Sequence, residues 1–130
     1  MRWTRTVLVA LVVGWTLACA GVVEGDLTLD GAPFSATSCA SGAPQGFVGV
    51  DLLDDSGRKL RLETGADGQA FVRLFESGLS AAEELGTCGP MSLTEQNSEI
   101  NGVKNVMGDA ELSCSGAHTL AGHVHYENCH

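Results

Sequence analysis

Short apolar runs separated by turn residues are the feature of this sequence that most restricts its fold. In residues 58–63, Leu60 and Leu62 alternate with charged side chains, which is the period of a strand with one buried face. The Asn-Gly pair at 101–102 and the Asp-Gly pair at 30–31 are typical of hairpin turns. This pattern predicts an all-β fold, a small antiparallel β-sandwich or barrel of about seven or eight strands.

The expected strands cover most of the chain after residue 22, and residues 77–86 are the exception. Ser80 and Glu83 fit a capping box and Gly86 fits a helix stop, which predicts one or two helical turns there. The expected strands are residues 23–29, 33–39, 47–53, 58–63, 70–75, 88–97, 103–114 and 118–128.

The first eighteen residues have the pattern of an export signal. Arg2 and Arg5 precede an uncharged, largely apolar run over residues 6–18, and small residues follow it. This run has 13 residues, whereas a membrane-spanning helix needs about 20, so an uncleaved anchor is the less favoured alternative. The sequence therefore predicts a signal peptide over residues 1–18 and a single exported domain over residues 19–130.

Cys19 is the predicted attachment point of a lipid. Residues 16–19 resemble a bacterial lipobox, in which the cysteine is acylated and becomes the first mature residue, so the expected partner is a membrane. Ala20 follows it, which in enteric-type sorting indicates the outer membrane. The alternative is cleavage before Gly21, which gives a soluble periplasmic or secreted protein.

Charge and aromatic content exclude some functions. Residues 19–130 contain all 16 acidic residues but only five of the seven basic ones, so their formal net charge is −11. A nucleic-acid partner is not expected, because such binding needs a basic surface. Only five aromatic side chains remain after residue 18, which argues against a deep pocket for a large organic ligand.

Four cysteines remain after Cys19 in a chain predicted to be exported, which indicates two disulfides. If the strands form an up-and-down series, Cys39 and Cys129 lie at one end and Cys88 and Cys114 at the other. The predicted pairs are therefore Cys39–Cys129 and Cys88–Cys114. A crossover in the strand order would alter this assignment.

The histidines offer a candidate metal site near the C-terminus. If the last hairpin turns at residues 115–117, Asp109 faces His123 and Met107 faces His125. His123 and His125 then lie on one face of a strand and, with Asp109, form a possible Zn²⁺ or Cu²⁺ site. The alternative is an exposed polar face without a bound ion. No other cofactor is expected.

Residues 101–114 and 122–130 together resemble a group of uncharacterised small lipoproteins from myxobacteria-like bacteria. The resemblance covers the whole exported domain and implies a cell-envelope protein, but it implies no activity. No nucleophile elbow or phosphate-binding loop occurs in the sequence. We therefore expect a non-enzymatic structural or interaction module. The alternatives are a periplasmic metal-binding protein and an unrecognised hydrolase.

Overall fold

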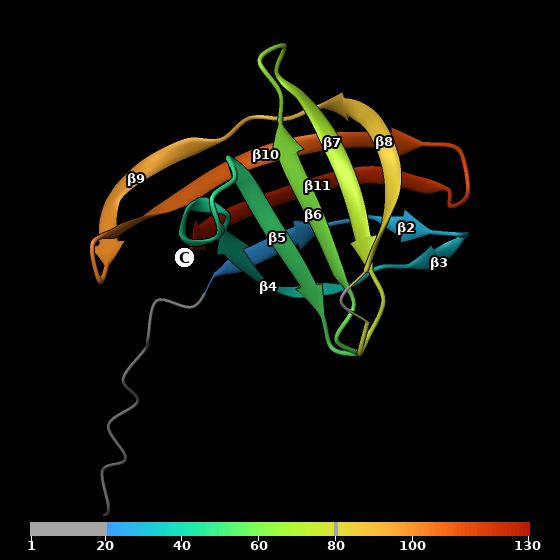
Figure 1. The fold of residues 1–130 in the computed structure, drawn as a ribbon, viewed down its shortest axis with the longest axis horizontal. Coiled ribbons are helices and arrows are strands. Elements are labelled where there is room, and N and C mark those ends of the chain that lie inside the picture. The colour runs from blue at the N-terminus through green and yellow to red at the C-terminus, as the bar shows by residue number, and fades with distance from the viewer. Residues whose placement is uncertain (1–20, 80) are drawn as a thin grey trace, which may run out of the picture.

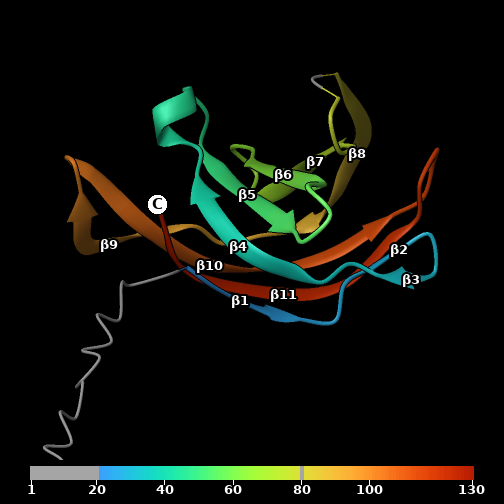
Figure 2. The same ribbon diagram turned by 90° about the horizontal axis from the view of Figure 1, so that it is seen from below.

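The structure is a computed structural model that describes residues 21–79 and 81–130. The predicted signal peptide over residues 1–18, the predicted acylation site Cys19 and the predicted cap residue Ser80 lie outside these ranges. The described chain folds as two antiparallel sheets packed face to face (Figures 1 and 2). The predicted all-β fold is confirmed as a sandwich of open sheets rather than a closed barrel. Within the described ranges, no helix has the length and apolarity to cross a membrane.

The first sheet is centred on the long hairpin of β10 and β11. The strand order is β3-β2-β11-β10-β9, and β1 also pairs with β11. Its six strands are β1 (Val22–Gly25), β2 (Thr28–Leu29), β3 (Ala32–Pro33), β9 (Thr94–Ile100), β10 (Val103–Cys114) and β11 (Leu120–Cys129).

The second sheet is a meander whose strands pair in sequence order, β4-β5-β6-β7-β8. Its strands are β4 (Ala36–Ser41), β5 (Gly49–Asp54), β6 (Lys59–Thr64), β7 (Gln69–Phe75) and β8 (Ala82–Pro90). A short 3-10 helix, η1 (Ala43–Gln45), connects β4 to β5.

The core lies between the sheets and consists of alternate residues of their strands. Leu60 and Leu62 are fully buried, as their spacing predicts, while Lys59 and Arg61 point outward. The most deeply buried large side chains are Val50, Leu52, Leu60, Leu62, Val72 and Leu74 from the second sheet and Asn105, Leu120, Val124, Tyr126 and Cys129 from the first. Burial of their apolar surfaces from water is the main force that holds the sheets together.

The chain has eleven strands rather than seven or eight, because three of the predicted ranges are interrupted. Range 23–29 breaks into β1 and β2 at Asp26, whose backbone N–H donates to the carbonyl of His123 (3.0 Å). The Asp26 carboxylate also accepts the N–H of His123 (2.8 Å). Range 33–39 likewise divides into β3 and β4, and range 88–97 divides into the end of β8 and β9.

The helical turns predicted for residues 77–86 are wrong. Residues from Ala82 onward form β8, in which Ala82 pairs with Phe75 and Glu84 pairs with Arg73 of β7. A helix this short is marginal by itself, whereas pairing satisfies the backbone groups along the edge of β7. The tertiary contact therefore decides the conformation here.

The predicted register of the last hairpin is wrong by two residues. Asp109 pairs with His125 rather than with His123, and Ala110 pairs with Val124. The reason is a longer loop over residues 115–119, in which Thr119 is held by Asp30 of the β2–β3 turn through two hydrogen bonds (2.7 and 2.9 Å). A slip of two residues leaves every side chain on its predicted face.

The two disulfides have the predicted pairing, and each joins one sheet to the other. Cys39 of β4 is bonded to Cys129 of β11, with their Cα atoms 5.0 Å apart. Cys88 of β8 is bonded to Cys114 of β10, with a Cα separation of 4.8 Å. The single up-and-down series used to predict them is wrong, because the chain crosses between sheets near Met91, which bridges to Ala110.

Candidate functional site

The three predicted metal ligands lie together on the outer face of the first sheet. His123 and His125 point outward from β11 because Val124 between them points into the core. Nε2 of His123 and Nδ1 of His125 lie 3.1 and 3.0 Å from the same oxygen, Oδ1 of Asp109 on β10. We call Asp109, His123, His125 and Glu127 the outer-face cluster.

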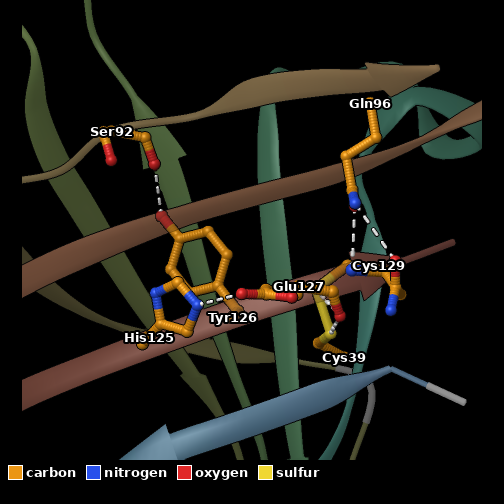
Figure 3. The surroundings of a disulfide bond; sticks show 8 residues. Cys39, Ser92, Gln96, His125, Tyr126, Glu127 and Cys129 are labelled. Atoms are coloured by element: carbon orange, nitrogen blue, oxygen red, sulfur yellow. Dashed lines mark hydrogen bonds and ion pairs between the residues drawn. A yellow bond between two sulfur atoms is a disulfide. The ribbon is translucent and has the colours of Figure 1, made fainter.

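Hydrogen bonds already use the ring nitrogens of the outer-face cluster. Nε2 of His125 contacts a carboxylate oxygen of Glu127 at 2.7 Å (Figure 3). This contact, and then that with Asp109, raises the pKa of His125 above its usual value and favours the doubly protonated ring. The carboxylate contacts of both histidines make the outer-face cluster a hydrogen-bonded polar surface.

A second histidine cluster lies where loops from the two sheets meet. His118 is in the β10–β11 loop, Asp30 is in the β2–β3 turn, Glu76 follows β7 and Glu83 is in β8. We call these four residues the loop cluster. In both views the β10–β11 loop and the β2–β3 turn lie at the same end of the molecule (Figures 1 and 2).

His118 is the centre of the loop cluster. Its Nδ1 lies 2.7 Å from Oδ2 of Asp30, and its Nε2 contacts the carboxylate of Glu83. Asp30 and then Glu83 raise the pKa of His118, while the hydrogen bond from His118 lowers the pKa of Asp30. The imidazole is thus fixed between carboxylates from the two sheets.

Three members of the loop cluster lie close enough together to hold a metal ion. One ligand atom each from Glu76, Glu83 and His118 lies within 4.8 Å of the other two. Among the described residues, no other group of three or more His, Cys, Asp or Glu side chains meets this condition. The trio of Asp109, His123 and His125 does not, so the structure favours a different histidine from the two predicted.

The loop cluster has no sequence motif. Its residues fit other patterns: Asp30 a turn, Glu83 a helix cap and His118 the start of the last strand. His118 is separated from Asp30 by 88 positions and from Glu83 by 35. No spacing rule connects such distant residues, because only the packing of the two sheets brings them together.

The histidine side chains of the two clusters contact carboxylates rather than hydroxyl or thiol groups of the described residues. The imidazoles of His118, His123 and His125 contact carboxylates, and within residues 21–79 and 81–130 no serine hydroxyl contacts a histidine ring. Nδ1 of His130 is buried without a hydrogen-bond partner in the described part of the chain.

A groove beside β9 is the second feature with functional potential. Its two adjoining hollows, of about 230 and 410 Å³, lie between η1 and the β9–β10 hairpin and share Ser41, Ala43, Glu95 and Val106. Val48 borders the smaller hollow and is 66% exposed. β9 is the last strand of its sheet, so one of its backbone edges has no partner strand within the described ranges.

Comparisons with protein-family models, with curated proteins and with solved structures find no match to this chain.

Proposed function

We propose that this chain is an exported cell-envelope protein, lipid-anchored through Cys19, that acts as a non-enzymatic interaction module. The free edge of β9 beside an exposed apolar groove is the observation that carries this proposal. An unpaired strand edge offers a row of backbone donors and acceptors to an extended segment of another protein. Side chains of that segment would enter the hollow bordered by Val48 and Leu93.

The start of the described chain supports direct attachment to a membrane. β1 begins at Val22, three residues after Cys19, and pairs with β11. Gly21 packs so closely on the Cys39–Cys129 disulfide that a Cβ there would lie 2.8 Å from Sγ of Cys39. An acylated Cys19 therefore holds the sandwich at the membrane surface with almost no linker. We place it at the outer membrane from the sorting pattern at Ala20.

The anchoring part of the proposal is tested by mass spectrometry of the mature protein and by membrane fractionation. We expect a chain that starts at an acylated Cys19 and sediments with outer membranes, and a Cys19→Ala variant that does not. A chain that starts at Gly21 without lipid would contradict the lipid anchor and favour a soluble periplasmic or secreted protein.

The interaction part is tested by a pull-down from envelope extract with two matched variants. Val48→Asp places a charge beside the β9 groove, and Leu79→Asp places one at a distant site of similar exposure, 63% against 66%. We expect a bound protein to be lost with Val48→Asp and retained with Leu79→Asp. Equal retention by both variants would show that the groove is not the binding surface.

A further inference from the structure

We propose that Glu76, Glu83 and His118 bind a divalent zinc-type metal ion, and that Asp30 is the positioning residue that orients His118. This site differs from the histidine pair at 123 and 125 and is independent of the anchoring and strand-edge proposals above. Its ligand would be a borderline transition-metal cation bound through His118, a residue that no sequence motif marks as a ligand.

The donor set suits Zn²⁺. Imidazole nitrogens and carboxylate oxygens both bind zinc, and three protein ligands leave the fourth tetrahedral position to water. Zinc–ligand distances of about 2.0–2.2 Å require ligand atoms about 3.3–3.6 Å apart in a tetrahedral site. The three atoms already lie within 4.8 Å of one another. Small rotations of the Glu83 side chain, which is 50% exposed, would complete the approach.

Asp30 supplies the carboxylate that orients the ring of a metal-binding histidine. Ligand histidines commonly donate the N–H of the other ring nitrogen to a carboxylate, which fixes the tautomer and the ring orientation. Here Nδ1 of His118 lies 2.7 Å from Oδ2 of Asp30, while Nε2 faces the glutamates. Oδ1 of Asp30 accepts the N–H of Thr119 at 2.9 Å, so the orienting carboxylate is itself held in place.

The electrostatic surroundings favour a cation. Three carboxylates, from Asp30, Glu76 and Glu83, surround a single imidazole. A divalent ion held at this point would offset the negative charge that the three carboxylates bring together.

The location of the site gives the ion a structural effect. Glu76 and Glu83 bracket the connection between β7 and β8 in the second sheet, whereas His118 and Asp30 belong to loops of the first sheet. An ion held by both sets would join the two sheets at the loop end of the β10–β11 hairpin. Binding to the folded state alone then stabilises that state in proportion to the ion concentration.

The test uses the full mature chain, purified without a histidine tag and treated with a chelator, in titration calorimetry with Zn²⁺. We expect one ion per chain and an increase in melting temperature of several degrees at saturating zinc. His118→Ala and Glu83→Gln are expected to weaken binding at least 10-fold. Because Glu83 is half exposed, Glu83→Gln preserves the fold and keeps the test valid if His118→Ala does not fold.

Two further variants distinguish this site from the histidine pair at 123 and 125 and test the role of Asp30. A His123→Ala/His125→Ala double variant is expected to bind Zn²⁺ as the unmodified chain does. Asp30→Asn is expected to weaken binding about 10- to 100-fold while the stoichiometry stays at one. Asn tolerates the left-handed backbone at position 30 (φ 53°), so the turn is retained. Co²⁺ in place of zinc should show an altered visible spectrum in Asp30→Asn, which a purely structural role would not produce.

Several outcomes overturn the proposal. They are no stoichiometric Zn²⁺ binding, binding that survives Glu83→Gln and His118→Ala unchanged, or binding that is lost in the His123/His125 double variant instead. Parallel titrations with Ca²⁺ and Mg²⁺ decide the ligand class, because these ions prefer sites made only of oxygen atoms. Tighter binding of Ca²⁺ than of Zn²⁺ would also contradict a zinc-type site.

Discussion

At the scale of single residues, Tyr126 shows how the sandwich satisfies a polar group in its core. The side chain is fully buried, and its hydroxyl donates to the carbonyl of Ser92 at 2.6 Å (Figure 3). Burial raises the pKa of the phenol well above its usual value, so the hydroxyl remains a donor at any ordinary pH. This bond ties β11 to the segment between β8 and β9.

Tyr126→Phe should lower the free energy of unfolding by about 1 kcal/mol, because it removes the hydrogen bond from the buried hydroxyl to the carbonyl of Ser92 while the ring still fills the same space. Urea unfolding monitored by circular dichroism measures the change. An unaltered midpoint would mean that water replaces the hydroxyl at Ser92.

Gly108 lies against the same carbonyl, and its lack of a Cβ allows the backbone at Ser92 to pack closely on β10. A Cβ at position 108 would lie 1.9 Å from the carbonyl oxygen of Ser92. Gly108→Ala should therefore cost about 2–3 kcal/mol through overpacking against the backbone. Gly116→Ala is the matched control, since a Cβ there meets no atom within 4 Å, and we expect a change within about 0.5 kcal/mol. Equal effects of the two substitutions in urea unfolding would contradict the packing argument.

At the scale of elements, β10 and β11 show what the sequence could and could not predict. The alternation of Ala110, Leu112 and Val124 identifies the buried face correctly, because side-chain period two is a local property. The register depends on the Asp30–Thr119 contact, which joins residues far apart in the chain. The conformation of β8 likewise depends on its pairing with β7. The loop cluster was not predictable for the same reason, since its residues come from three separate parts of the chain: the β2–β3 turn, the β7–β8 region and the β10–β11 loop.

The pairing of β10 with β11 also predicts a pH dependence through His125. Its pKa is raised above the usual 6.5 by Glu127 first and by Asp109 second. A raised pKa in the folded state stabilises that state fully below about pH 6.5. This stabilisation is lost as the pH rises through the folded-state pKa of His125. The free energy of unfolding should therefore decrease from about pH 6.5 upward in metal-free buffer.

Two variants assign this pH dependence to the outer-face cluster. His125→Gln should make the free energy of unfolding less dependent on pH above about pH 6.5, because the titrating ring is absent. Glu127→Gln removes the contact that raises the pKa of His125 most, so the loss of stability should move to lower pH. Urea unfolding at half-unit pH intervals gives the measurement. An unchanged profile in both variants would assign the dependence to other groups.

At the scale of the whole molecule, the two disulfides brace a domain that has two separate sheets. Cys129 and Cys114 are at opposite ends of the β10–β11 hairpin, because Cys114 pairs with Leu120 whereas Cys129 pairs with Val106. Each cysteine is bonded to a strand of the second sheet, Cys39 in β4 and Cys88 in β8. The sheets are thus fixed to each other at both ends of the longest hairpin.

The two disulfides should contribute differently to the free energy of unfolding, because they close loops of different length. Cys39 and Cys129 are 90 positions apart, and Cys88 and Cys114 are 26 apart. In the chain-entropy model the longer loop restricts the unfolded state more, so its disulfide contributes about 4–5 kcal/mol and the shorter one about 3–4 kcal/mol.

The Cys39→Ala/Cys129→Ala double variant should consequently lose about 1 kcal/mol more stability than the Cys88→Ala/Cys114→Ala variant. Urea unfolding of both double variants, with linear extrapolation to zero denaturant, measures the difference. All four cysteines are buried, so the loss of packing is similar in the two variants and largely cancels from the comparison. An equal or larger loss of stability in the Cys88→Ala/Cys114→Ala variant would contradict this ranking. Strain in the folded state or residual structure in the unfolded chain would then outweigh loop entropy. The Cys88–Cys114 end would be the one that mainly holds the sheets together.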